Sequence, residues 1–129
     1  RPGQMAVGNV LSIAFTLNGA SGIHFAGLIE RLEIAEQVKA KAVTRAGGLI
    51  AELVAAGEAE IAVQQIPELM AVPGIELVGP LPKELQVITV SAAGVFVDAK
   101  QPEAARALLE FLSTPASARV LEAKGLERA

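Results

Sequence analysis

A turn of small residues between two apolar segments is the first place in the chain where chemistry can be expected. The apolar, β-rich run Val10–Thr16 leads into the sequence NGASG, and an amphipathic stretch then predicts a helix over Gly22–Leu32. A helix start with almost no side chains leaves its backbone N–H groups open to an anion, without any charged residue. The sequence therefore predicts that an anion is held at Ala20, Ser21 and Gly22.

A second turn of this kind has the sequence RAGG and lies directly before a helix predicted over Gly48–Ala56. Gly47 and Gly48 are candidate ligand contacts there, although ordinary loop glycines would give the same pattern. Ser21 in the first turn has two compatible interpretations. It can be the N-cap of the helix, because serine is among the best helix caps, and it can contact a ligand. Arg45, beside the second turn, is expected to be solvated.

A pair of amides, Gln64 and Gln65, follows the apolar residues Ile61–Val63 in a strand predicted over Ile61–Gln65. Side chains alternate along a strand, so one of the two amides should face the core side or a cleft. An amide at the carboxyl end of a strand could orient a ligand as a neutral donor. A polar strand end that enters a loop is the alternative.

Groups for acid–base or nucleophilic catalysis are scarce: the chain has one His, one Asp, no Cys and no Tyr. Glu58 and Glu60 would share one face of a strand, but a solvated strand start explains them as well. His24 could donate to an anion or be structural. No residues have the spacing of a metal site, a phosphate-binding loop or a serine hydrolase. We expect no enzyme activity, no metal and no cofactor.

Composition narrows the class of protein further. The 129 residues, 52% hydrophobic and 19% charged, suffice for one domain with a real core. A net charge of −3, four Phe and no Trp or Tyr exclude a typical nucleic-acid surface. Residues 5–29 lack Asp, Glu, Lys and Arg, but polar residues and glycines interrupt them. A strand, a turn and a helix are therefore preferred there to a membrane span.

Strands and helices alternate in the first half of the chain, which predicts a parallel sheet. The predicted fold class is α/β, with a central, mostly parallel sheet flanked by helices and with two C-terminal helices. Pro and Gly punctuate the second half, and Thr114 is the predicted N-cap of the last helix. The remaining predicted elements are strands at Lys41–Thr44, Ile75–Val78, Gln86–Val90 and Gly94–Asp98, and helices at Ala35–Lys39, Glu103–Leu112 and Pro115–Lys124.

Four segments resemble the periplasmic molybdate-binding proteins of ABC transporters, which have the type II periplasmic-binding-protein fold. In chain order they are ASGIHFAGLIERL, KAVTRAGGLIAELVAAGEAEIAVQQIPEL, PGIELVGPLPKELQ and QPEAARALLEFLSTPASARVLEAKGLE. The order and spacing of these segments are more specific than any one of them. The resemblance implies a two-lobed clamp that closes on a tetrahedral oxyanion such as molybdate or tungstate, an ABC transporter permease as partner, and a periplasmic location.

The resemblance also gives three residues a role by position. Ser21 corresponds to a small residue that offers its backbone N–H, and Gly47 corresponds to the start of the second helix, which does the same. Gln65 falls where molybdate binders commonly place a Tyr hydroxyl, whereas this chain has no Tyr. The anion would then meet an amide in place of the aromatic hydroxyl.

A division of the chain follows from the same resemblance. Residues 1–9 would be an N-terminal extension, residues 10–98 the second ligand-binding lobe, and residues 99–129 helices that pack on a first lobe, which we expect to be missing. Apolar helix faces left uncovered in this way predict self-association. The alternative function is the ligand-sensing effector domain of a transcription regulator, which can share this fold.

Overall fold

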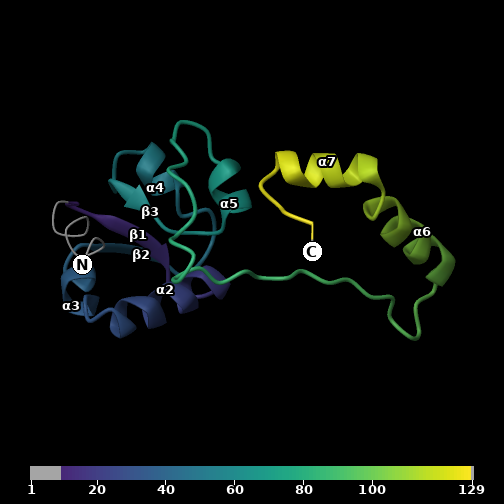
Figure 1. Cartoon of the computed structure of the whole chain (residues 1–129), viewed down its shortest axis with the longest axis horizontal. Helices are drawn as coiled ribbons and strands as arrows, with labels where there is room; N and C mark the ends of the chain where they lie inside the picture. Colours follow the sequence, from purple (N-terminus) through teal and green to yellow (C-terminus); the bar gives the residue numbers. More distant parts are fainter. Residues whose placement is uncertain (1–9, 129) are drawn as a thin grey trace. The chain divides into compact units, whose positions relative to one another are not determined.

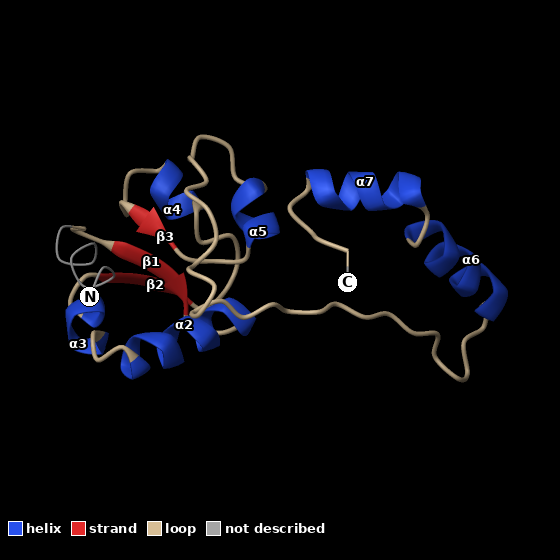
Figure 2. Cartoon of the chain, viewed as in Figure 1, coloured by secondary structure: helices blue, strands red, loops and turns tan. Residues whose placement is uncertain are grey.

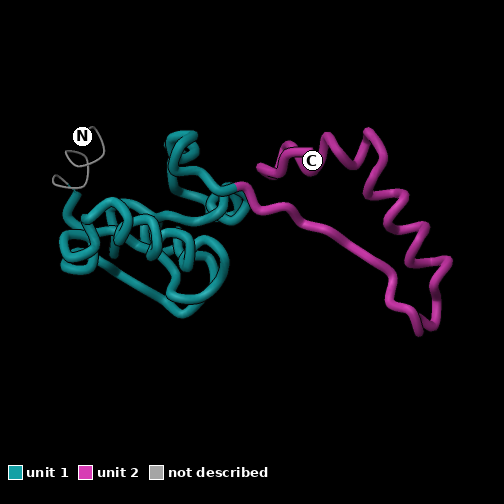
Figure 3. Tube along the Cα trace, turned by 60° about the horizontal axis from the view of Figure 1, so that its bottom comes forward, with its two compact units in different colours: residues 1–87 teal, residues 88–129 magenta. Residues whose placement is uncertain are grey.

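A computed structural model describes residues 10–128 of the chain, so the extension predicted at residues 1–9 lies outside the described part. The chain divides into two compact units, residues 1–87 and residues 88–129 (Figure 3). The first unit contains the sheet and helices α2 to α5, and the second contains α6 and α7 (Figure 1). Within residues 10–128, no helix has both the length and the apolar character needed to span a membrane.

Three parallel strands form the sheet of the first unit, in the order β2-β1-β3. β1 (Ile13–Thr16) lies in the centre, with β2 (Ala42–Arg45) on one side and β3 (Ile61–Ala62) on the other. Ile13 is in register with the first residue of each neighbour, and all four residues of β1 are buried. Burial on both faces is typical of a central parallel strand. The predicted α/β class and parallel sheet are confirmed.

One face of the sheet is covered by α2 (Ala20–Arg31) and α3 (Ala35–Lys39) (Figure 2). The larger core cluster lies here, because the odd-numbered residues of β1 point to this side. The rings of Phe15 and Phe25 meet edge-on within it, with centroids 5.1 Å apart. The helix predicted from the spacing of apolar residues after Gly22 is thus seated by an aromatic contact on the central strand.

The opposite face of the sheet packs on α4 (Glu52–Ala55), where Ala14 shares a smaller cluster with Leu53. α5 (Ile66–Met70) follows β3, and it is absent from the predicted elements because Pro67 looks like a break in the sequence. In the structure this proline lies in the first turn of α5, where a missing N–H removes no helical hydrogen bond. Helices therefore cover both faces of the sheet.

The three strands predicted over Ile75–Val78, Gln86–Val90 and Gly94–Asp98 do not form, and this prediction is wrong. A strand needs a hydrogen-bonded neighbour, and within residues 10–128 no strand lies beside these segments. Most of their apolar side chains are exposed instead, Ile88 by 76% and Val97 by 89%.

The second unit consists of a long connection and the helices α6 (Pro102–Leu112) and α7 (Pro115–Ala123). Thr114 caps α7, since its hydroxyl accepts a hydrogen bond from the Ser117 N–H at 3.2 Å, as the sequence predicts. No residue of α6 is buried, and Phe111 is 63% exposed. The two predicted C-terminal helices are present. Their apolar surface is not covered by other residues of the second unit.

Gly22 marks the closest approach between α2 and the sheet. A Cβ atom at this position would lie 1.9 Å from the carbonyl oxygen of Thr16, a distance that no real contact reaches. Only a residue without a side chain lets the first turn of α2 sit on the carboxyl end of β1.

We expect Gly22→Ala to lower the free energy of unfolding by at least about 2 kcal/mol, because backbone must move to admit the methyl group. Gly27→Ala is the matched control in the same helix: its added Cβ would meet nothing within 4 Å. Alanine at that place should raise stability by about 0.5–1 kcal/mol. Urea denaturation followed by circular dichroism measures both, and equal effects would contradict a special role for Gly22.

Candidate functional site

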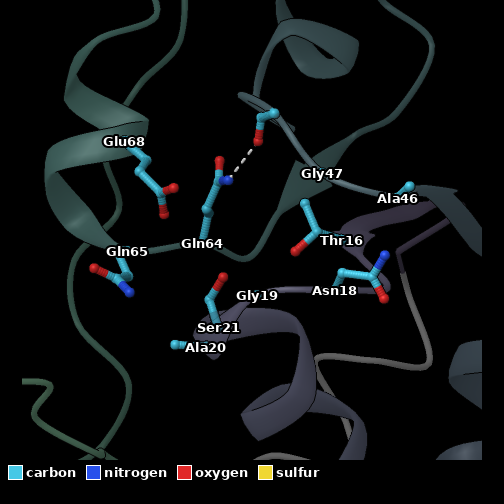
Figure 4. A pocket seen from close by; sticks show the side chains of 11 residues that line it. Thr16, Asn18, Gly19, Ala20, Ser21, Ala46, Gly47, Gln64, Gln65 and Glu68 are labelled. Carbon is cyan, nitrogen blue, oxygen red and sulfur yellow. Dashed lines mark hydrogen bonds between the residues drawn. The ribbon is translucent and has the colours of Figure 1, made fainter.

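A pocket of about 180 Å³ lies at the carboxyl ends of the three strands (Figure 4). Its walls come from the end of β1 and the start of α2, from the loop after β2, and from the segment that joins β3 to α5. This edge is where open parallel sheets bind their ligands. The lining residues are Thr16, Asn18, Gly19, Ala20, Ser21, Ala46, Gly47, Gly48, Gln64, Gln65 and Glu68.

The pocket brings together most of the residues that the sequence selects as ligand contacts. Ala20, Ser21, Gly47, Gly48 and Gln65 all line it. Gly22 does not, because its role is the close packing against Thr16 described above. Two turns that are far apart in the sequence therefore face one space.

The start of α2 supplies unpartnered backbone donors. Gly19, with a φ of 89°, precedes the helix, and the first turn closes when the Ile23 N–H donates to the Gly19 oxygen at 3.1 Å. Inside the described chain, the N–H groups of Ala20, Ser21 and Gly22 have no acceptor, as expected for a first helical turn. Ser21 lies within the helix and no side chain caps it, so the interpretation of Ser21 as the N-cap is wrong.

The second wall is a loop and not a helix start. α4 begins only at Glu52, so the helix predicted to open at Gly47 and Gly48 is wrong in that part. Gln64 accounts for the difference: its Nε2 donates to the Gly48 oxygen at 2.7 Å, and its Oε1 accepts from the Ile50 N–H at 3.0 Å. The amide takes the place of helical hydrogen bonds and holds the loop in an open shape.

Two backbone hydrogen bonds fix the distance between the walls. The N–H of Leu17 donates to the Arg45 oxygen at 2.8 Å, and the N–H of Asn18 donates to the Ala46 oxygen at 3.1 Å. These bonds continue the pairing of β1 with β2 beyond the ends of the strands. The mouth of the pocket is thus an extension of the sheet.

Thr16 also lines the pocket, although the sequence did not predict it as a ligand contact. Its side chain is only 3% exposed, yet its hydroxyl points into the pocket, toward Ser21 and Gln64 in Figure 4. That hydroxyl has no hydrogen-bond partner among residues 10–128. No buried side-chain oxygen or nitrogen of the described residues lacks a partner, so the unpartnered Thr16 oxygen is itself accessible from the pocket and can bond to a ligand there.

Glu68 is the only charged residue that lines the pocket in the described chain. It comes from α5, is partly buried, and directs its carboxylate toward Gln64 (Figure 4). None of the ion pairs among residues 10–128 includes it, and Arg45 is instead paired with Glu52 at 3.2 Å. No cation lies in the lining to balance this carboxylate.

The other residues considered for chemistry lie away from the pocket. His24 Nε2 is 3.1 Å from the carbonyl oxygen of Leu85, where a ring N–H can donate, so the structural interpretation of His24 fits. Glu60 accepts a hydrogen bond from the Leu11 N–H at 2.7 Å, at the amino end of the sheet. Across the described residues, no group of three or more His, Cys, Asp or Glu could hold a metal ion.

Residues 4–127 match the family described as "Bacterial extracellular solute-binding protein". The chain belongs to this family. It is also 35% identical over 117 residues to a Pseudomonas sp. protein named aconitate isomerase, an alignment that covers 90% of this chain and 44% of the relative. The chain therefore spans less than half the length of that relative. No solved structure matches the chain.

The family confirms the broader part of the predicted resemblance, a solute-binding protein with an α/β lobe. The family description does not support specificity for molybdate, and the relative is named after a different compound, aconitate. Glu68 has no signal in the sequence that could reveal it, because it reaches the pocket only through the unpredicted helix α5. Thr16 could have been found, since it is the polar residue that ends an apolar run.

We expect Gln64→Leu to lower the free energy of unfolding by about 1–3 kcal/mol, because Gly48 and Ile50 lose their side-chain partner together. Amide hydrogen exchange at the Ile50 N–H should accelerate. Gln65→Leu is the matched control: that side chain is exposed, and the change should stay within about 0.5 kcal/mol. Unchanged exchange at Ile50 in Gln64→Leu would show that the loop keeps its shape without the amide.

Proposed function

We propose that the protein is the solute-binding component of an ABC importer and that the pocket forms one half of a site for a small anion. The observation that carries this proposal is the position of the unpartnered N–H groups of Ala20 and Ser21, in the first turn of α2, at a pocket at the carboxyl end of the sheet. Membership in a solute-binding family supports the transport role and favours it over the effector domain of a regulator. The partner is then a membrane permease, the location is extracytoplasmic, and no catalysis takes place.

The chemistry of the walls suits an anion held by neutral donors. The N-terminus of a helix carries roughly half a positive charge, and its N–H groups already point at the site. The Thr16 and Ser21 hydroxyls can donate from the same side. Several neutral hydrogen bonds can fix the position of an anion. A buried ion pair would bind the anion more tightly and release it more slowly.

Two classes of ligand fit this description. A tetrahedral oxyanion such as molybdate or tungstate follows from the resemblance to molybdate binders, with the Gln65 amide in place of the aromatic hydroxyl. A carboxylate is the second candidate, which the relative named aconitate isomerase favours, since aconitate carries three carboxylates. Both classes would accept hydrogen bonds from the same donors at the start of α2.

We expect a bound anion to raise the melting temperature of the full chain, because a ligand that binds only the folded state stabilises it by RT ln(1 + [L]/Kd). Molybdate, tungstate, sulfate and citrate serve as probes, each against sodium chloride of equal ionic strength. If none of them shifts the transition beyond the chloride control, the pocket does not bind anions in this chain.

Thr16→Val separates binding from folding. Valine has nearly the shape of threonine, and the hydroxyl has no partner in the described chain, so the unliganded melting temperature should stay the same or rise. The affinity for the anion that binds best should fall about 5–10-fold with one lost hydrogen bond. Equal affinities of the two proteins would show that the hydroxyl does not face the ligand.

We further propose that the chain self-associates through its C-terminal helices. The exposed apolar side chains of α6 and α7 form the surface concerned: Leu108, Phe111, Leu112, Val120 and Leu121. Exposure of these large apolar side chains to water is unfavourable, so their burial against a second copy of the chain is favoured.

Sedimentation equilibrium should accordingly show a mass that increases with concentration. Phe111→Lys should weaken this association, because a charge would replace a large apolar side chain that is 63% exposed. Glu110→Lys is the matched control, since it introduces the same side chain at the neighbouring exposed position, about 100° around the helix. A clean monomer at all concentrations would contradict the proposal.

A further inference from the structure

The pocket proposed for an anion contains a charge of the wrong sign. Glu68 is the only charged residue among the lining side chains of the described chain, and its carboxylate is directed inward (Figure 4). It has no ion-pair partner among residues 10–128. Arg45, the cation next to the loop after β2, is paired with Glu52 and does not line the pocket.

A bare anion in this space would meet repulsion from the Glu68 carboxylate, and no cation among the described lining residues offsets it. The helix N-terminus offers only about half of a positive charge, against the full negative charge of a carboxylate. Like charges repel more strongly once the ligand has displaced water between them. A second acceptor group facing Glu68 would also leave both groups without a donor, which is costly in a partly closed pocket.

Thr16 marks where the acceptor end of a ligand belongs. Its side chain is 3% exposed, its hydroxyl is unpartnered within the described residues, and it points into the pocket on the side of the α2 start. Glu68 belongs to α5, which comes from the other wall. The pocket therefore offers donors at Thr16 and the first turn of α2, and an acceptor at Glu68.

We propose that Glu68 selects solutes that carry their own hydrogen-bond donor next to an anionic group. The anionic group accepts hydrogen bonds from the start of α2 and from Thr16, while the hydroxyl or acid proton of the solute donates to the Glu68 carboxylate. This inference rests on the proposed anion site and narrows its ligand class. Hydroxycarboxylates and hydrogen phosphate fit, whereas fully deprotonated molybdate, tungstate and sulfate do not.

Isothermal titration calorimetry on the full chain tests this with ligand pairs that differ in the donor. Malate is compared with succinate, and phosphate with sulfate, at pH 7, where phosphate keeps a proton and sulfate has none. The donor-bearing member of at least one pair should bind at least about 10-fold more tightly, because a site that accepts a hydrogen bond rejects the analogue that lacks it. The pair that shows the difference tells whether the donor is a carbon-bound hydroxyl or an acid proton.

Glu68→Gln should reduce that preference to about twofold or less and raise the affinity for sulfate and succinate, since the amide can itself donate. Glu76→Gln is the matched control, an exposed carboxylate outside the pocket lining, and should keep the preference of the parent chain. Glu68→Asp retains the charge and should retain part of the preference, which separates loss of charge from loss of fold.

The outcomes separate this inference from the anion site itself. If succinate and sulfate bind as tightly as malate and phosphate, Glu68 does not select a donor, while the proposed anion site stands. An unchanged preference in a folded Glu68→Gln protein also overturns the inference. If none of the four probes binds, the anion site and the role of Glu68 fail together.

Discussion

The close contact of Gly22 with the Thr16 carbonyl is the constraint on which the site depends. With a Cβ only 1.9 Å from that oxygen, any other residue would push α2 away from the end of β1. The contact places three unpartnered N–H groups directly above the carboxyl end of the central strand. The pocket then needs only a second wall, which the loop after β2 provides through its hydrogen bonds to Leu17 and Asn18.

Gln64 shows how a neutral side chain can shape such a wall. Its amide bonds both to the Gly48 oxygen and to the Ile50 N–H, so it satisfies backbone groups that neither strand nor helix reaches. Both ends of the amide are thereby used to position the loop. Gln65 also lines the pocket, and its side chain makes no such bond.

The parts of the fold that the sequence predicts well are those with a local cause. β1, α2 and the cap at Thr114 follow from apolar spacing, small residues and a hydroxyl before a proline. The strands expected at Gln86–Val90 and Gly94–Asp98 failed because a strand depends on a partner that local sequence does not specify. The second helix start failed for a related reason, because Gln64 acts on Ile50 across 14 positions of the chain.

The same distinction explains which part of the site escaped prediction and why it matters most. Backbone donors at a glycine-rich turn have a local signature, so the side of the pocket proposed to hold an anion is visible in the sequence. Glu68 enters the pocket only because α5 folds back after β3, and its effect comes from a position opposite those donors. In the proposed site, the donors for an anion are thus encoded locally, whereas the selection among anions would depend on tertiary placement. One wall of the pocket carries about half a positive charge and the other a full negative charge. In the proposed site, only a solute with both an acceptor and a donor can form favourable hydrogen bonds with both walls.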